Sequence, residues 1–467
     1  MRRAQPGLEF IPPRYRVWVC RGVHALLPWW MRWQLQITQV RVEGAATLVP
    51  WYEKVQQKQA RVLLAFRHPT LDDPYLILYL LSRSVPQAAQ ALGVKLKYPL
   101  HNYFLYDRGI PLWAGRWVSW LFSRLGGVPI QRGRSDRTAL KTIRELLLRG
   151  DMPLTVAPEG GINNHSERLA PLEPGLPQMG FWCLEDLAKQ GQEALPVVII
   201  PIGLQYGFLH APWQKMQDLL AQMERSCGLP AGQAGFSQAE QRQEQLYGRL
   251  LRLADVLLTQ MEEFYARFYQ QPRPDIPPDT DLSVNEQLRM RLEHLREVAL
   301  GVTEAFFGLQ REGTAIDRCR RLEAAAWEWM YRQDLAALSP IARCLADRIA
   351  QEAALRLWHM QLVERLTSVT GDYIREKPSA DRFAETTLIL WSVVTHLQGK
   401  DRPVKLGQRW AVIRVGEPIA LNDYWETYRR SRKDAREAVN QVTAVLAQRL
   451  QNLIETERHA DRPIKLT

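Results

Sequence analysis

The stretch Phe66-Arg67-His68-Pro69-Thr70-Leu71-Asp72-Asp73-Pro74 decides the organisation of this chain. It follows the apolar run of residues 62–66, which is short and uninterrupted and therefore predicts a strand buried on both faces. Pro69 cannot continue a central strand, but its restricted φ suits the start of a helix. If a strand ends at His68 and a helix begins shortly after it, the imidazole can hydrogen-bond the carboxylate of Asp73.

Such a pair has a specific chemical use. A carboxylate on one ring nitrogen sets the tautomer of a histidine and leaves the other nitrogen as a general base. His68 and Asp73 would then supply two members of a serine-protease-type triad, with a substrate hydroxyl in place of the serine. A simpler interpretation also stands, in which the histidine caps a turn beside a solvated acidic pair, because H-x-x-x-x-D alone is a weak pattern.

Composition limits the class of protein. The chain has 467 residues, enough for two or three domains, and a net charge of +11. Such a positive charge suits nucleic acid or an anionic membrane surface, but no nucleic-acid recognition motif is present and we expect no such partner. The five cysteines are odd in number and show no metal or redox spacing, so we expect reduced thiols, a cytosolic protein and no metal. We also expect no signal peptide and no membrane-spanning helix.

Two segments combine basic and aromatic residues. Residues 1–50 carry seven arginines against two glutamates, interleaved with four tryptophans, which is typical of a helix lying in a membrane interface. We therefore expect a peripheral or monotopic protein on the cytoplasmic face of a membrane, in contact with anionic lipid. The alternative is a helix docked on the core with a basic outer face. Residues 97–125 are either a second interfacial or acyl-facing patch or a plain aromatic core.

Strands alternate with helices over residues 37–208. Further strands are predicted at 37–42, 128–131, 153–157 and 196–203, so we expect an α/β domain with a mostly parallel sheet flanked by helices. Arg132 follows one strand at the edge where α/β folds place ligand groups, and Ser135 is expected to cap the next helix and complete an anion site. Glu159, Gly160 and Gly161 follow another strand, where glycines permit close ligand approach; a tight turn with an exposed glutamate is the alternative.

Four blocks in order carry a resemblance. His68-x4-Asp73, Val128-Pro129-Ile130-x-Arg132, Pro158-Glu159-Gly160 and Ile200-Pro201-Ile202-Gly203 resemble the motifs of the glycerolipid acyltransferase family, whose best-known members are lysophosphatidate (1-acylglycerol-3-phosphate) acyltransferases. The resemblance implies transfer of a fatty acyl group to a lysophospholipid hydroxyl from a thioester on acyl carrier protein or coenzyme A, with no bound cofactor. It further implies that His68 is the base, Asp73 its orienting partner, Arg132 the phosphate ligand and Glu159 the residue that orders the acceptor site.

The sequence departs from the family pattern beside that glutamate. The family has Thr-Arg-Ser where this chain has Gly161-Ile162-Asn163, and the missing arginine helps to bind phosphate. Phosphate recognition would then pass to Arg132, Arg134 or Arg137, or the acceptor is another lysolipid or a non-phosphorylated alcohol. Arg67 stands where the family has an asparagine, and Ala157 where it has an aromatic residue. A non-catalytic, membrane-bound scaffold remains a further alternative.

The rest of the chain is predicted to be helical until a final strand. Residues 410–419 resemble the strand and Gly-Glu-Pro-Ile block that closes this family's domain. We therefore expect an interfacial segment at 1–36, an α/β core at 37–211, an all-helical insertion at 212–405 and a strand and helix at 406–467 that complete the core. Ser283, Ser339 and Ser379 are predicted helix starts within the insertion. The insertion is expected to dock acyl carrier protein, cover the site or contact another subunit.

Overall fold

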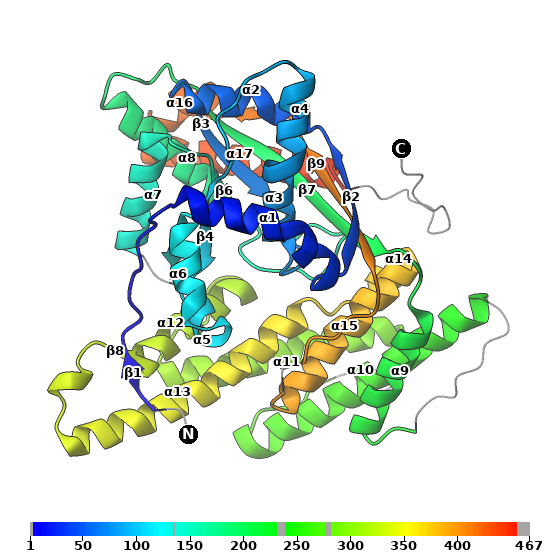
Figure 1. Ribbon diagram of the computed structural model, residues 1–467. Coiled ribbons are helices and arrows are strands. Elements are labelled where there is room, and N and C mark those ends of the chain that lie inside the picture. Colours follow the sequence, from blue (N-terminus) through cyan, green and yellow to red (C-terminus); the bar gives the residue numbers. More distant parts are fainter. Residues whose placement is uncertain are drawn as a thin grey trace. The chain divides into compact units, whose positions relative to one another are not determined.

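The computed structural model describes residues 3–131, 133, 136–230, 239–275, 282–400 and 402–454 (Figure 1). The chain divides into two compact units. The α/β unit comprises Glu9–Gln131, Asp136–Leu209 and Gln408–Thr467, and the helical unit comprises Met1–Leu8, Arg132–Ser135 and His210–Gly407. Residues 1–8 thus group with the helical unit, which differs from the single N-terminal segment of residues 1–36 expected from the sequence.

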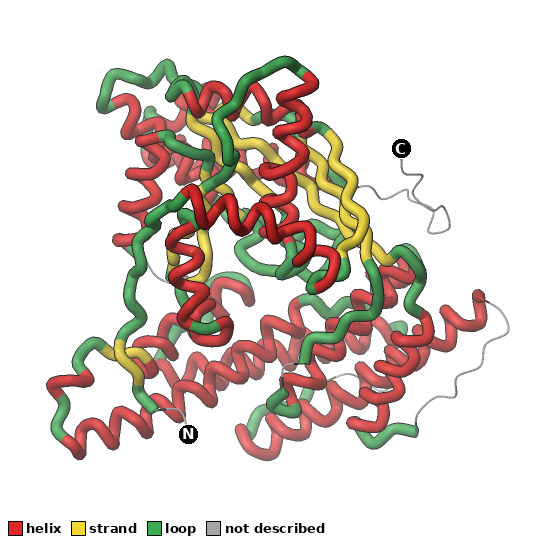
Figure 2. The backbone as a smooth tube through the Cα atoms, in the orientation of Figure 1, coloured by secondary structure: helices red, strands yellow, loops and turns green. Residues whose placement is uncertain are grey.

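The α/β unit is built on one mostly parallel sheet, shown in yellow in Figure 2, and this confirms the predicted fold class. Its main strands lie in the order β2 (Ile37–Glu43), β9 (Arg409–Val415), β7 (Val197–Phe208), β3 (Arg61–Phe66), β6 (Leu154–Val156), β4 (Tyr103–Asp107) and β5 (Gly127–Ile130). Strands β7, β3, β6, β4 and β5 run parallel to one another, whereas β9 is antiparallel to β7 and parallel to β2. The short β10 (Ile419–Ala420) also pairs with β7.

Strand β3 shows why the sheet has two covered faces. All six of its residues are buried. Val62, Leu64 and Phe66 pack into one hydrophobic cluster, while Leu63 and Ala65 pack into another on the opposite face. This is the pattern that an uninterrupted apolar run predicts for a central parallel strand. Truncating a buried leucine such as Leu64 to alanine would cost about 2–5 kcal/mol of unfolding free energy.

Helices supply the two outer layers of this unit. The first cluster includes residues of α1 (Val17–Trp33), α2 (Ala45–Gln56), α3 (Asp73–Tyr79), the π-helical turn Leu80–Ser84 and α4 (Val85–Ala91). The second includes residues of α7 (Arg137–Arg149), α8 (Gly175–Ala188), α16 (Trp425–Tyr428) and α17 (Arg432–Asn452). The unit also contains α5 (Ile110–Ala114), α6 (Arg116–Arg124) and a 3-10 turn at Leu421–Tyr424. Across the described residues, no helix has both the length and the apolar character needed to cross a bilayer.

The helical unit consists mainly of long helices. They are α9 (Trp213–Ser226), α10 (Ala239–Tyr269), α11 (Val284–Phe307), α12 (Ala315–Met330), α13 (Pro340–Thr367), α14 (Asp372–Glu376) and α15 (Ala380–Leu397), with a 3-10 turn at Leu335–Ala337. Two short strands, β1 (Gln5–Pro6) and β8 (Tyr331–Arg332), pair in parallel. Ser283, Ser339 and Ser379 are the N-caps of α11, α13 and α15, as their sequence context predicted.

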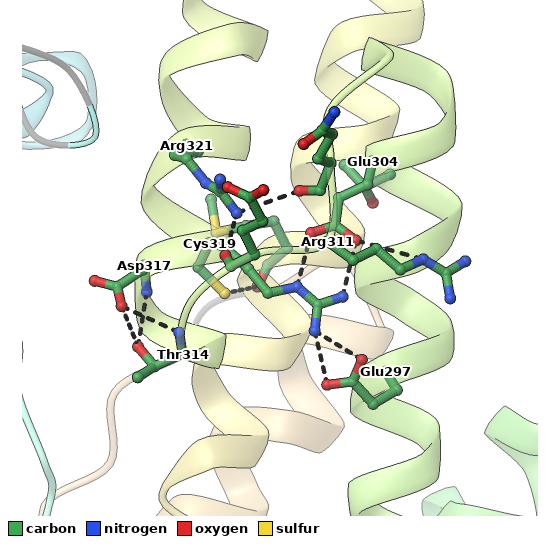
Figure 3. Close-up of polar contacts among 12 residues, drawn as sticks. Glu297, Glu304, Arg311, Thr314, Asp317, Cys319 and Arg321 are labelled. Carbon is green, nitrogen blue, oxygen red and sulfur yellow. Dashed lines mark hydrogen bonds and ion pairs between the residues drawn. The ribbon is translucent and has the colours of Figure 1, made fainter.

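A buried ion pair joins two helices of this unit, and Figure 3 labels two glutamates of this region, Glu297 and Glu304. The guanidinium of Arg318 on α12 makes two hydrogen bonds, of 2.7 and 2.8 Å, to the carboxylate of Glu304 on α11 and also contacts Glu297. Thr314 is the N-cap of α12 and forms a capping box with Asp317, in which each side chain accepts the backbone N–H of the other residue. This capping box was not predicted from the sequence. Because Arg318 and Glu304 are both buried, the removal of either one would leave the other with only its more exposed partner, which is Glu297 for Arg318 and Arg311 for Glu304.

Candidate active site

The polar residues of the candidate site gather at the carboxyl ends of parallel strands. His68 follows β3 by two residues, Glu159 follows β6 by three, and Tyr206 lies in the last part of β7. The strands β6, β3 and β7 are direct neighbours in the sheet. Parallel strands bring the residues that follow them to one edge, and α/β folds place their ligands there.

His68 and Asp73 form the central contact. The Nδ1–H of His68 donates a hydrogen bond of 2.8 Å to Oδ2 of Asp73, which is the first residue of α3. The Asp73 side chain is fully buried, whereas 19% of the His68 side chain is exposed. Since a carboxylate only accepts, Nδ1 is the donor, and in the neutral imidazole Nε2 then keeps the lone pair. The interpretation of a histidine beside a solvated acidic pair is therefore wrong for Asp73.

Two further donors hold the Asp73 carboxylate. The backbone N–H of Thr70 donates to Oδ2 at 2.9 Å, and the hydroxyl of Tyr206 donates to Oδ1. Burial raises the pKa of Asp73, while the hydrogen bonds from His68, Tyr206 and Thr70 act in the opposite direction. Burial and the Asp73 charge also raise the pKa of Tyr206 well above its ordinary value, so this hydroxyl remains a donor. The carboxylate is thus fixed on three sides.

Glu159 positions the backbone of the histidine. Its Oε1 accepts a 2.6 Å hydrogen bond from the His68 N–H, and its Oε2 accepts one of 3.0 Å from the N–H of Ala170 and another from the Asn163 amide. Only 2% of Glu159 is exposed, so the alternative of a turn with an exposed glutamate is wrong. Burial raises the pKa of Glu159, and the nearby guanidinium of Arg67 opposes that rise.

Arg67, which from the sequence is only a departure from the family pattern, connects two segments beside the site. Its side chain is fully buried and donates to backbone carbonyls on two segments. The guanidinium donates to the carbonyl of Leu204 on β7 at 3.0 Å. It also donates, at 2.7–3.1 Å, to three carbonyls of the loop after β6, those of His165, Ser166 and Arg168. A planar guanidinium with five donors is suited to such a set of acceptors. Arg67 therefore holds the loop against the strand beside His68.

The loop after β6 is folded by its own polar residues. Asn163 donates its backbone N–H to the His68 carbonyl at 3.2 Å, and its side-chain oxygen accepts from the N–H of His165 at 2.9 Å. Gly160 has a φ of +66°, which favours glycine, and a Cβ added at Gly161 would meet no atom within 4 Å. The space beside Gly161 is open, so the backbone there is accessible.

Of the three arginines predicted to bind phosphate, only Arg137 is among the described residues, and it does not contact His68, Asp73 or Glu159. Arg132 and Arg134 lie outside the described residues. Arg137 is exposed at the start of α7, where it lines a surface pocket together with other residues of α7 and α8. Ser135, the predicted cap of this helix, also lies outside the described residues; the N-cap of α7 is Asp136, which accepts from the N–H of Ala139 at 3.2 Å.

A second contact of Asp136 concerns charge at the same sheet edge. Its carboxylate pairs with Arg108, which directly follows β4 and was not selected from the sequence. Asp136 also accepts the backbone N–H of Gln131 at 3.0 Å. The charge of Arg108 is thus neutralised within the protein.

Fold and site together define an α/β protein that holds a carboxylate-oriented histidine at the carboxyl edge of its sheet, an arrangement suited to general-base transfer chemistry. Residues 40–205 match the family model described as Acyltransferase, so this stretch is a domain of the glycerolipid acyltransferase family and supports an acyl-transfer activity. The match includes His68, Asp73 and Glu159. No match was found among curated proteins or among solved structures.

Proposed function

We propose that the protein transfers a fatty acyl group from a thioester on acyl carrier protein or coenzyme A to the free hydroxyl of 1-acyl-sn-glycerol-3-phosphate, forming phosphatidate. The observation that carries this proposal is the 2.8 Å hydrogen bond between His68 and Asp73 inside an acyltransferase-family domain. It leaves Nε2 of His68 as the proton acceptor. The domain assignment supports acyl transfer in general. The identity of the acceptor, lysophosphatidate, is our proposal.

The proposed reaction is a direct transfer. Nε2 of His68 removes the proton from the acceptor hydroxyl as its oxygen bonds to the thioester carbonyl carbon. The resulting tetrahedral intermediate collapses by breaking the carbon–sulfur bond, and the leaving sulfur takes the proton from the His68 imidazolium and departs as a free thiol. Asp73 stabilises the imidazolium between these two steps. General-base catalysis of this kind contributes about 10²–10⁴ in rate.

A second acceptor class has support from one feature of the site. Asn163 stands within the segment where the family has Thr-Arg-Ser, and its side-chain amide donates to Glu159 and to the Arg168 carbonyl. That amide is therefore committed to the fold of the loop rather than to a phosphate. The same transfer to a lysolipid with another head group, or to a non-phosphorylated alcohol, is accordingly our second candidate.

A membrane surface is the proposed setting of the reaction, with the protein peripheral or monotopic on its cytoplasmic face. Large apolar side chains are exposed on α1, on α5 and α6, and in the active-site loop: Trp18, Leu26, Trp29, Trp30, Trp33, Leu71, Leu112, Trp117 and Trp120. The ring centroids of Trp18 on α1 and Trp120 on α6 lie 6.4 Å apart, so the two helices contribute to one exposed aromatic surface. Arg21 and Arg32 are exposed on α1. Tryptophan and arginine together favour an anionic bilayer interface.

A panel of acceptors tests the proposal. The purified chain is given one labelled acyl thioester at a time, on acyl carrier protein or on coenzyme A, with 1-acylglycerol-3-phosphate, other lysophospholipids or monoacylglycerol. Labelled phosphatidate supports the first candidate, and transfer only to another acceptor supports the second. His210→Gln, at an exposed histidine of the helical unit, is the control and should retain activity. The absence of transfer from either donor to any acceptor would refute an acyltransferase function.

A further inference from the structure

We propose that Cys20, His24 and His101 form a binding site for a single Zn²⁺ ion in the α/β unit, separate from the His68 group. The sulfur of Cys20 and one ring nitrogen of each histidine lie within 4.8 Å of one another. None of these residues takes part in the proposed acyl transfer. The proposal departs from the sequence-based expectation of no metal. The sequence did not indicate this site, because His101 is far from Cys20 and His24 along the chain and no spacing motif joins them.

Two of the ligands share one helical face. Cys20 and His24 are four residues apart on α1, so their side chains project from the same side. Cys20 Sγ lies 3.4 Å from Nε2 of His24. A tetrahedral zinc ion with ordinary sulfur and nitrogen bond lengths would place two such ligand atoms about 3.6 Å apart. These two atoms are therefore already near the separation that a shared zinc ion requires.

The third ligand supplies an independent observation. His101 is 2% exposed, and its Nε2 lies 2.8 Å from the carbonyl oxygen of Leu125. That carbonyl only accepts, so Nε2 carries the proton and Nδ1 keeps the lone pair. His101 Nδ1 is itself buried and has no hydrogen-bond partner. Metal-binding histidines commonly donate their second N–H to a backbone carbonyl in this way.

The three side chains also form a donor set that suits zinc. Zinc binding would replace the thiol proton, which leaves to solvent as the sulfur–zinc bond forms. One thiolate and two imidazoles match the ligand preference of Zn²⁺ and leave a fourth position for water.

The site would tie α1 to the body of its unit. His101 lies in the segment before β4, and the Leu125 carbonyl that orients its ring lies at the end of α6. The ring of Tyr15 stacks on His101 with centroids 5.4 Å apart and so forms one wall of the cluster. A zinc ion bound only by the folded chain raises the midpoint of thermal unfolding. We therefore expect zinc to stabilise the protein through the packing of α1.

Cobalt provides the direct test. The full chain, freed of metal with a chelator, is titrated with Co²⁺ and monitored for thiolate-to-cobalt charge-transfer absorption. We expect one equivalent to bind, Zn²⁺ to displace it, and Zn²⁺ to raise the midpoint of thermal unfolding. Cys20→Ala and His24→Gln should abolish the charge-transfer band. The matched controls Cys183→Ala, at another buried cysteine of the same unit, and His210→Gln should keep it.

Two results would overturn the site. One is the absence of a charge-transfer band in the folded native chain, as judged by circular dichroism. The other is an unchanged band in the Cys20→Ala and His24→Gln variants. His24 is half-buried, so its substitution keeps the test decisive if the Cys20 variant does not fold.

Discussion

His68 and Asp73 meet through a 2.8 Å hydrogen bond although five positions separate them. On a continuous helix five residues correspond to about 500°, so the two side chains would point in different directions. The chain instead leaves β3 at Phe66, turns through Pro69 and starts α3 at Asp73. This change from strand to helix is the local geometry that converts a weak sequence pattern into a paired base and acid.

Tyr206→Phe should change the pH dependence of the reaction. The hydroxyl donates to the ionised Asp73, so its loss raises the pKa of a carboxyl that burial already raises. Asp73 must be ionised to stabilise the His68 imidazolium. Activity should therefore be lost at a higher pH on acidification, and the acidic limb of the kcat/KM profile should move upward by about one unit, the equivalent of roughly 1.4 kcal/mol.

The control for this variant is Tyr428→Phe. Tyr428 also donates to a carboxylate, Glu185, but it packs in the second hydrophobic cluster rather than beside Asp73. Its variant should retain the native acidic limb. A Tyr206→Phe profile that overlays that of the native protein would show that this hydroxyl does not act on the His68–Asp73 pair.

Glu159→Gln should weaken both folding and activity. The carboxylate receives donors on both oxygens, so an amide would place an N–H group against another donor, either His68 N–H or Ala170 N–H. We expect a loss of about 1–3 kcal/mol in the free energy of unfolding, measured by urea denaturation, and a lower kcat. Glu193→Gln, at an exposed position, should change neither quantity. Native stability and kcat in the Glu159 variant would contradict the positioning role.

Arg67 and Arg61 allow a paired comparison at the two ends of β3. Both are buried, and both donate to backbone carbonyls; Arg61 contacts Leu148, Lys58 and Ala60. Replacing either arginine by lysine removes hydrogen-bond donors to these carbonyls. Each lost charged hydrogen bond lowers the free energy of unfolding by about 1.5–3 kcal/mol. We expect both variants to lose stability, but only Arg67→Lys to lose acyl transfer, when both are assayed below their unfolding midpoints. Equal losses of activity would mean that Arg67 acts through stability alone.

The double variant Trp29→Ser, Trp33→Ser should bind membranes more weakly. Both indoles are mostly exposed on α1. Losing their burial in a bilayer interface should reduce partitioning onto anionic vesicles by at least about tenfold, or roughly 1.4 kcal/mol, in a co-sedimentation assay. Trp329→Ser, at an exposed tryptophan of the helical unit, should bind like the native chain. Unchanged sedimentation of the double variant would exclude α1 as the membrane contact.

The strands and helix starts that could be predicted from the sequence are those whose signals lie within a few consecutive residues. Residues 62–66 of β3 and 197–202 of β7 are uninterrupted apolar runs, and helix starts such as Ser283 carry their capping partner three residues away. Strand β4 was not predicted, because Tyr103–Asp107 contains aromatic and polar residues and has no uninterrupted aliphatic run. An aromatic strand and an aromatic surface patch have similar compositions.

The missed site residues act over long separations. Tyr206 reaches Asp73 from 133 residues away, and Arg67 binds carbonyls about 100 residues or more distant. No local pattern marks such partners in one sequence, although a charged residue between a buried strand and a candidate catalytic histidine was a usable signal for Arg67. The N-cap of α7 was misplaced by one residue, since Ser135 and Asp136 are both good caps.

The most direct test of the acyltransferase assignment is the rate of acyl transfer by His68→Gln compared with native protein, with labelled acyl thioester and 1-acylglycerol-3-phosphate. We predict a fall in kcat of about 10²–10⁴ because the general base is lost, with an unfolding midpoint close to that of the native chain. A folded His68→Gln protein that transfers acyl groups at a near-native rate would contradict the account.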